Sequence, residues 1–297
     1  MTDTPMTEAR FALFVDRIRR STLPKRLFTH RLFLTGFILF LAVLTMAVLA
    51  SYLAPHAPNQ NNFRYRLGEP NATHWLGTDN FGRDVLSRVI YGSQVSLRIG
   101  FMVVIMNAVF GTLIGASAGY FRKLDNPIMR VMDGLMAFPA ILLAIALAAT
   151  LGPSEFNAVL ALTVAYTPRT ARIVRASVLV VREMDYVQAA LASGAGHARI
   201  LFRHVLVNSM APLIVQLTFI FAVAVLAEAV LSFIGVGPPP PTPTWGNIIS
   251  EGRNYIREAP WISLYPGIAI AITVLGLNLL GDGLRDVLDP RMKVETR

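Results

Sequence analysis

The sequence predicts an all-α, polytopic membrane protein with about six transmembrane helices. Three observations support this fold class. First, 54% of the 297 residues are hydrophobic and only 15% are charged, whereas a soluble domain carries about a quarter charged residues. Second, the apolar residues gather in blocks of about 20, the length that crosses a bilayer as a helix. Third, the basic residues alternate along the chain in the order that six spans require.

The apolar blocks divide the chain into spans and connecting segments. The first block is a run of 23 uncharged, mostly apolar residues, longer than the 7–15 of a signal peptide, so we expect it to remain as a helix. The chain then divides into a cytoplasmic N-terminal tail (1–31), the first span, an outer loop (55–98), a transmembrane core (99–284) with a cytoplasmic loop at about 178–208, and a cytoplasmic C-terminal tail (285–297). The predicted spans are residues 32–54, 99–120, 128–151, 157–173, 211–233 and 264–280.

The charge distribution predicts the orientation. With the N-terminus inside, 20 of the 27 Lys and Arg residues fall in inner segments and six in outer ones, while Arg98 lies at a boundary. Basic residues are enriched in cytoplasmic loops. We therefore expect both termini to be cytoplasmic. The lipid bilayer then accounts for the net charge of +9, and no nucleic-acid partner is needed.

Two features inside the predicted spans are candidates for function. Gly111, Gly115 and Gly119 recur every four residues and form a stripe for close helix packing, either within this subunit or against a second membrane subunit. Glu228 is the only acid well inside an apolar block, which makes it a candidate intramembrane polar site. Alternatively, Glu228 reaches the membrane interface or a helix cap. Pro139 and Pro168 each predict a kink in their span.

Catalytic and metal signatures are missing from the sequence. The chain has no cysteine, and no Gly-Lys pair that could form a phosphate-binding loop. His74 and Asp79 share one outer loop, but their spacing does not predict a metal site. We therefore predict a non-enzymatic chain without a metal or cofactor of its own.

The stretch between the fourth and fifth spans predicts a helical hairpin. Asp185 suits the N-cap of a short helix, and Gly194 suits the left-handed residue that follows a helix end. A second helix would begin near His197. Such a knob at the inner membrane face fits a groove on a soluble partner.

This stretch resembles the cytoplasmic signature loop of permease subunits of bacterial ABC importers, in which Glu-Ala-Ala is followed by Gly and later by Ile and Leu-Pro. Two residues depart from the signature: Gln188 replaces Glu, and Val207 replaces Pro. The resemblance implies a type I ABC importer permease fold and a loop that docks on the ATPase subunit. The coupling residues it implies are Asp185, Tyr186, Gln188, Ala189, Ala190, Gly194, Ala195 and Arg203.

Three further stretches resemble the second permease of the dipeptide/oligopeptide/nickel group: residues 74–88, 231–247 and 278–291. The implied partners are a second homologous permease, two ATP-binding subunits that hold ATP and Mg²⁺, and a periplasmic solute-binding protein. The implied cargo is di- or oligopeptides. Nickel, glutathione or another small solute is the alternative within the group. A secondary transporter driven by an ion gradient is the alternative outside it.

Overall fold

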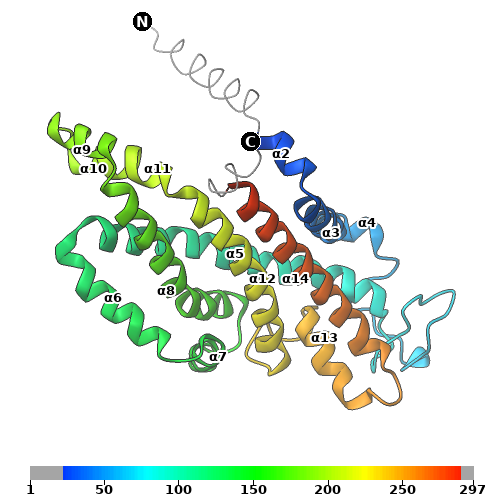
Figure 1. The fold of residues 1–297 in the computed structure, drawn as a ribbon. Helices are drawn as coiled ribbons and strands as arrows, with labels where there is room; N and C mark the ends of the chain where they lie inside the picture. Colours follow the sequence, from blue (N-terminus) through cyan, green and yellow to red (C-terminus); the bar gives the residue numbers. More distant parts are fainter. Residues whose placement is uncertain (1–22, 289–297) are drawn as a thin grey trace, which may run out of the picture.

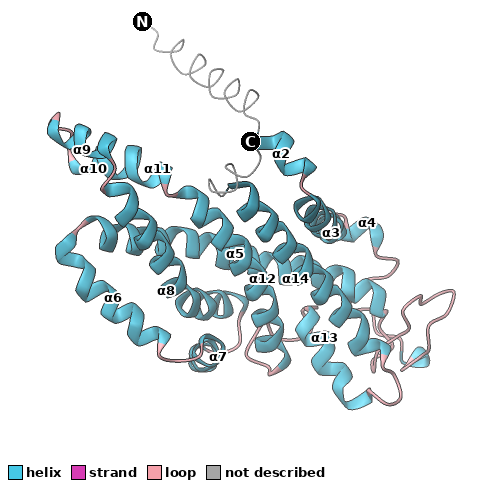
Figure 2. Ribbon diagram, viewed as in Figure 1, coloured by secondary structure: helices cyan, strands magenta, loops and turns pink. Residues whose placement is uncertain are grey.

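The structure, a computed structural model, describes residues 23–288 and is built from helices (Figures 1 and 2). Within that range no strand forms, and a single isolated bridge pairs Thr78 with Asp84. Short single-turn helices cover Phe63–Tyr65, Leu201–Val205 (a π-helical turn) and Arg253–Tyr255. The α-helices are α2 (Leu23–Thr29), α3 (Arg31–Val48), α4 (Ala50–Leu53), α5 (Val85–Tyr120), α6 (Arg122–Met136), α7 (Ala140–Leu151), α8 (Glu155–Arg182), α9 (Asp185–Ala192), α10 (His197–Ile200), α11 (Leu206–Asn208), α12 (Met210–Phe233), α13 (Trp245–Gly252) and α14 (Trp261–Leu288).

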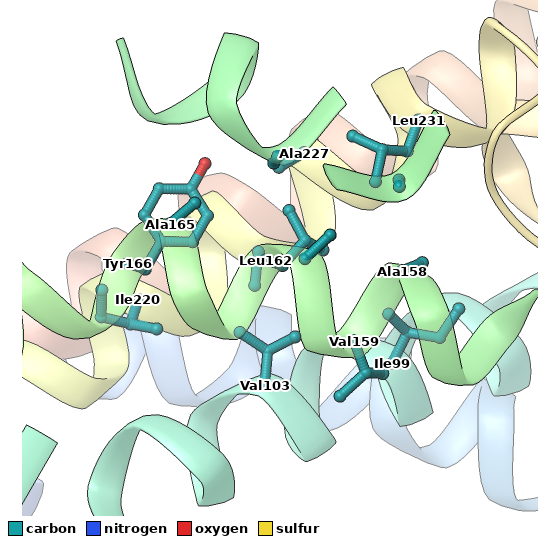
Figure 3. Packing of buried hydrophobic residues seen from close by; sticks show 14 of the residues in the cluster. Ile99, Val103, Ala158, Val159, Leu162, Ala165, Tyr166, Ile220, Ala227 and Leu231 are labelled. Atoms are coloured by element: carbon teal, nitrogen blue, oxygen red, sulfur yellow. The ribbon is translucent and has the colours of Figure 1, made fainter. Parts of the chain in front are cut away.

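The centre of the bundle is the packing of α5, α8 and α12. Figure 3 shows Ile99 and Val103 of α5 beside Leu162 of α8, with Ile220 and Leu231 contributed by α12. These side chains are at most 1% exposed, so they bury their apolar surface inside the chain itself. A second cluster joins α3, α5, α12, α13 and α14.

Four described helices are long and apolar enough to cross a membrane: α3, α5, α12 and α14. The pair α6 and α7 would make a fifth span, but its two helices meet at a bend of 87°. α8 is 28 residues long, yet Arg169, Arg172 and Arg175 interrupt its inner half. The all-α membrane fold is therefore confirmed, whereas the count of six spans stays a prediction.

Two predicted segments differ from the helices of the structure. Residues 128–151 do not form one continuous helix, because the chain leaves the helix after Met136 and α7 begins only after Pro139. Proline has no N–H to donate and disfavours a helical conformation in the residue before it. Pro168, in contrast, lies inside the continuous helix α8.

The second difference concerns the segment before residue 99, which was expected to be loop. α5 begins at Val85, so residues 85–98 belong to a helix and not to the outer loop. This stretch contains several polar residues, among them Arg88 and Gln94, so hydropathy alone does not find it. The outer loop and α13 cover it instead: Trp245 of α13 donates from its indole nitrogen to the Val89 carbonyl at 3.0 Å.

The contacts assign the elements to two ends of the bundle. At one end lie the last turns of α5, α8 and α14, together with α2 and the segment α9–α11 (Figure 1). At the other end lie the loop of residues 54–84 and α13, which meet the first turns of α5 and α14. We refer to these as the inner end and the outer end.

Candidate functional site

The candidate site is a helical hairpin, residues 185–200, at the inner end. Its turn follows from Gly194, whose φ of +78° lies in the left-handed region that suits glycine. The Gly194 N–H donates to the Leu191 carbonyl, and the Ala195 N–H donates to the Ala190 carbonyl. This pair of bonds is the Schellman arrangement that ends a helix. Asp185 is the first residue of α9, and Met184 holds the N-cap position, so the predicted capping role of Asp185 was wrong.

Apolar side chains fix the hairpin to the bundle. Val187 of α9 and Ile200 of α10 are fully buried, and Val205 of the following turn is buried with them. They join a cluster that includes Val174 and Val178 of α8. The hairpin is therefore packed onto the inner turns of α8.

Polar contacts reinforce this attachment. Arg182, the last residue of α8, donates to the carbonyls of Gly119 (3.0 Å) and Tyr120 (3.3 Å) at the end of α5. The Tyr120 hydroxyl lies 2.9 Å from His197 Nδ1. Gln188 donates from Nε2 to the Arg182 carbonyl at 3.0 Å. Sequence analysis did not identify the bonds of Arg182 to the end of α5 or of Tyr120 to His197, because these partners are 62 to 77 residues apart along the chain.

The opposite face of the hairpin is exposed. Tyr186 is 41% exposed, and Asp185, Gln188, Ala189 and Gly194 are exposed around it. Ala190 and Ala195 are half-buried, and Arg203 is exposed on the π-helical turn. The short side chains beside the Tyr186 ring allow another protein to approach the hairpin backbone closely. No reacting group is needed for such a contact.

The glycine stripe lies against α8 of the same chain. A Cβ added to Gly111 would lie 2.6 Å from Thr170 Cγ2, and one added to Gly119 would lie 2.8 Å from Val178 Cγ1. At Gly115 the added atom would meet the Ala171 carbonyl oxygen. The stripe therefore lets α5 and α8 approach closely inside the subunit.

Glu228 is wholly enclosed, so it does not reach a water-facing surface. Its Oε1 accepts a hydrogen bond from the Ser232 hydroxyl at 2.6 Å. Ser96 of α5 and Thr244, the N-cap of α13, border the same carboxyl group. Glu228 therefore sits where three helices meet.

Ion pairs between charged side chains join the outer loop and α5 to α13 at the outer end. Asp79 Oδ2 accepts from Arg83 Nε at 2.6 Å and from Arg88 Nη1 at 2.5 Å. Both arginines also reach Glu251 of α13, at 2.5 and 2.6 Å. Asp79 thus pairs with arginines and not with His74, its neighbour in the outer loop.

The family follows from sequence comparison. Residues 109–294 match the family described as "Binding-protein-dependent transport system inner membrane component". The chain belongs to this family. Residues 24–71 match the N-terminal transmembrane domain of oligopeptide transport permease C. The predicted ABC importer permease group is confirmed, and with it a multi-pass protein of the inner membrane.

Relatives of this permease cover nearly its whole length. A putative peptide transport system permease of Brucella abortus is 55% identical over 91% of this chain and 92% of its own. A dipeptide transport system permease of Alkalihalophilus pseudofirmus is 44% identical over 91% and 89%. A probable D,D-dipeptide transport system permease of Escherichia coli is 43% identical over 86% and 87%.

A solved structure supports the fold. An inward-facing structure of the MetNI methionine ABC transporter matches with a TM-score of 0.57 at 19% identity. The match covers 68% of this permease and 97% of the other chain. At this identity the likeness concerns the fold alone.

Proposed function

We propose that this permease is one of the two membrane subunits of an ATP-driven peptide importer. Relatives named as peptide and dipeptide permeases, 42–55% identical over most of the chain, support the cargo class. In this proposal a second, homologous permease completes the route across the membrane. Two ATP-binding subunits hold ATP and Mg²⁺, a periplasmic solute-binding protein delivers the peptide, and this chain supplies no catalytic group.

One observation carries the mechanism: the hairpin has a buried face fixed to α8 and an exposed face free for a partner. When the ATP-binding subunits close, the exposed face around Tyr186, Ala189 and Gly194 moves with them. The buried Val187 and Ile200 pass that movement to α8, because they are packed against it. This is coupling through a rigid element with two arrangements. The bundle then alternates between inward-open and outward-open states.

Mutation of Gly194 tests this coupling. Proline fixes φ at about −65°, so Gly194→Pro cannot keep the observed φ of +78°. Asparagine tolerates left-handed backbone, and an added Cβ at this position meets no atom within 4 Å. We expect Gly194→Pro to insert into the membrane but to lose ATP-driven uptake and co-purification of the ATP-binding subunits. Gly194→Asn should keep both. Normal uptake by the Gly194→Pro complex would refute the coupling role.

The proposed orientation puts the hairpin and both termini in the cytoplasm. The chain has no cysteine, so a single introduced cysteine is a unique label. In intact spheroplasts, a membrane-impermeant maleimide should react with Asn61→Cys in the outer loop. It should react with Ala189→Cys only after the membrane is opened. Labelling of Ala189→Cys in intact spheroplasts would show that the hairpin faces outward. That result would refute both the proposed topology and the coupling mechanism.

The cargo is tested with the purified complex in proteoliposomes. We expect the cognate binding protein to deliver labelled di- or oligopeptides when ATP is present on the side of the ATP-binding subunits. Uptake of nickel or glutathione but not of peptides would favour the alternative within the group. Uptake that persists without the ATP-binding subunits would favour the ion-coupled alternative.

A further inference from the structure

Two histidines and an aspartate meet at the outer end from three separate parts of the chain. His56 follows α4, His74 lies in the middle of the outer loop, and Asp84 is the N-cap of α5. His74 Nδ1 lies 2.9 Å from Asp84 Oδ1, and His56 Nδ1 lies 3.9 Å from the same oxygen. The three candidate ligand atoms are all within 4.8 Å of one another. Both imidazole rings therefore turn a nitrogen towards one carboxylate oxygen.

The hydrogen bonds in this cluster leave atoms that can bind a metal ion. Asp84 caps α5 with Oδ2, which accepts from the Ser87 N–H at 2.8 Å, so the cap does not use Oδ1, the oxygen that contacts His74. His56 Nδ1 is buried and makes no hydrogen bond to any described residue. A buried polar atom without a partner is costly and calls for an explanation. The His56 N–H donates to Ser87 Oγ at 3.0 Å, which holds this histidine beside the cap.

The spacing suits a small divalent metal ion. Zinc binds histidine nitrogen and carboxylate oxygen at about 2.0–2.2 Å with tetrahedral geometry, so its ligand atoms lie roughly 3.4 Å apart. The observed 2.9 and 3.9 Å bracket this value. All three ligand atoms lie within 4.8 Å of one another, so shifts of about 1 Å per side chain would bring them to tetrahedral spacing. The His56 side chain is 29% exposed, which leaves an approach from solvent and room for a water ligand.

We infer that His56, His74 and Asp84 bind one divalent transition-metal ion of the zinc class, with water as the fourth ligand. The ion ties the segment after the first span to the outer loop and to the first turn of α5. It joins the loop to the bundle at a point separate from the ion pairs that Arg83 and Arg88 make with Asp79 and Glu251. The inference concerns a resident ion and is independent of the imported solute.

The test measures zinc in the complete purified importer, washed with chelator and then equilibrated with zinc alone. His56→Phe removes a ligand but keeps a ring in contact with His74, whose centroid lies 4.8 Å away. His204→Phe is the matched control, since it removes a histidine at the inner end. We expect His56→Phe to bind one zinc ion fewer per copy of this chain than wild type, as counted by mass spectrometry of the eluted metal. The control should bind as wild type does.

A second variant separates loss of a ligand from loss of fold. His56→Cys replaces the nitrogen with a thiolate, another zinc ligand. It should retain the ion, and with cobalt in place of zinc it should gain a sulfur-to-metal charge-transfer band that wild type lacks. Equal zinc content in wild type and His56→Phe, or cobalt spectra of His56→Cys without that band, would overturn the inference. The cluster would then be a hydrogen-bonded helix cap without an ion.

Discussion

The two ends of the permease are held together by different interactions. At the inner end the hairpin is attached by apolar side chains such as Val187 and Ile200 and by hydrogen bonds to backbone carbonyls. At the outer end, buried ion pairs join the outer loop to α13. An apolar contact is non-directional and tolerates small displacements. A buried charge pair tolerates little, since a separated charge in a low dielectric is very costly. We therefore expect the outer end to be the more rigid of the two.

The largest effect should come from breaking the outer network. Arg88 is 1% exposed and contacts both Asp79 and Glu251. Arg88→Met leaves two carboxylates without this partner, and losing one member of a buried pair costs about 3–5 kcal/mol. We expect a large fall in the thermal unfolding midpoint of the purified complex. Arg98→Met is the control, because Arg98 pairs with Glu155 at a site where its side chain is 51% exposed. Breaking an exposed pair costs about 0–1 kcal/mol, so equal effects of the two variants would contradict a rigid outer end.

A medium effect should come from the glycine stripe between the two ends. In Gly115→Ala the new methyl group meets the Ala171 carbonyl oxygen, a backbone atom that cannot rotate away. Overpacking of this kind costs about 1–3 kcal/mol. Gly134→Ala in α6 is the matched control, because a Cβ there meets no atom within 4 Å. Alanine favours a helix over glycine by about 1 kcal/mol, so the control should be neutral or stabilising in the same unfolding assay. A destabilised control with a neutral Gly115→Ala would contradict the close α5–α8 contact.

Sequence predicted the apolar helices well where hydropathy alone decides. The span expected at 211–233 is α12, Met210–Phe233, because a polar segment bounds the apolar run on the inner side and glycines bound it on the outer side. The first 14 residues of α5 were not predicted as helix, because other parts of this chain bury them and they carry polar side chains. A hydropathy profile detects helices whose side chains face lipid. It does not detect a partly polar helix that a loop of the same chain covers.

The candidate site was predictable only where it depends on local backbone. Gly194 was identified because a left-handed residue after a short helix leaves a local signature. The contacts that fasten the hairpin were not predictable: Arg182 and Tyr120 are 62 residues apart in sequence. The enclosed position of Glu228 likewise depends on α5 and α13, which meet it only in the folded chain.

The smallest effect should come from Gln188, where this chain departs from the glutamate of the signature loop. Its amide donates to the Arg182 carbonyl, which a carboxylate cannot do because it only accepts. Gln188→Glu should therefore loosen α9 from the end of α8. The bond is exposed, so the loss is about 0.5–1 kcal/mol, the lower part of the range for a hydrogen bond. Amide hydrogen exchange in α9 should then quicken by a few-fold, while exchange in α12 stays unchanged.

Gln188→Ala distinguishes a lost bond from a gained charge. If the bond alone matters, the alanine and glutamate variants should show the same exchange in α9 and the same co-purification of ATP-binding subunits. If the two variants retain the ATP-binding subunits differently, residue 188 contacts the partner directly. Residue 188 would then both hold the hairpin to α8 and contact the partner. The hairpin would not divide into one face for attachment and another for docking.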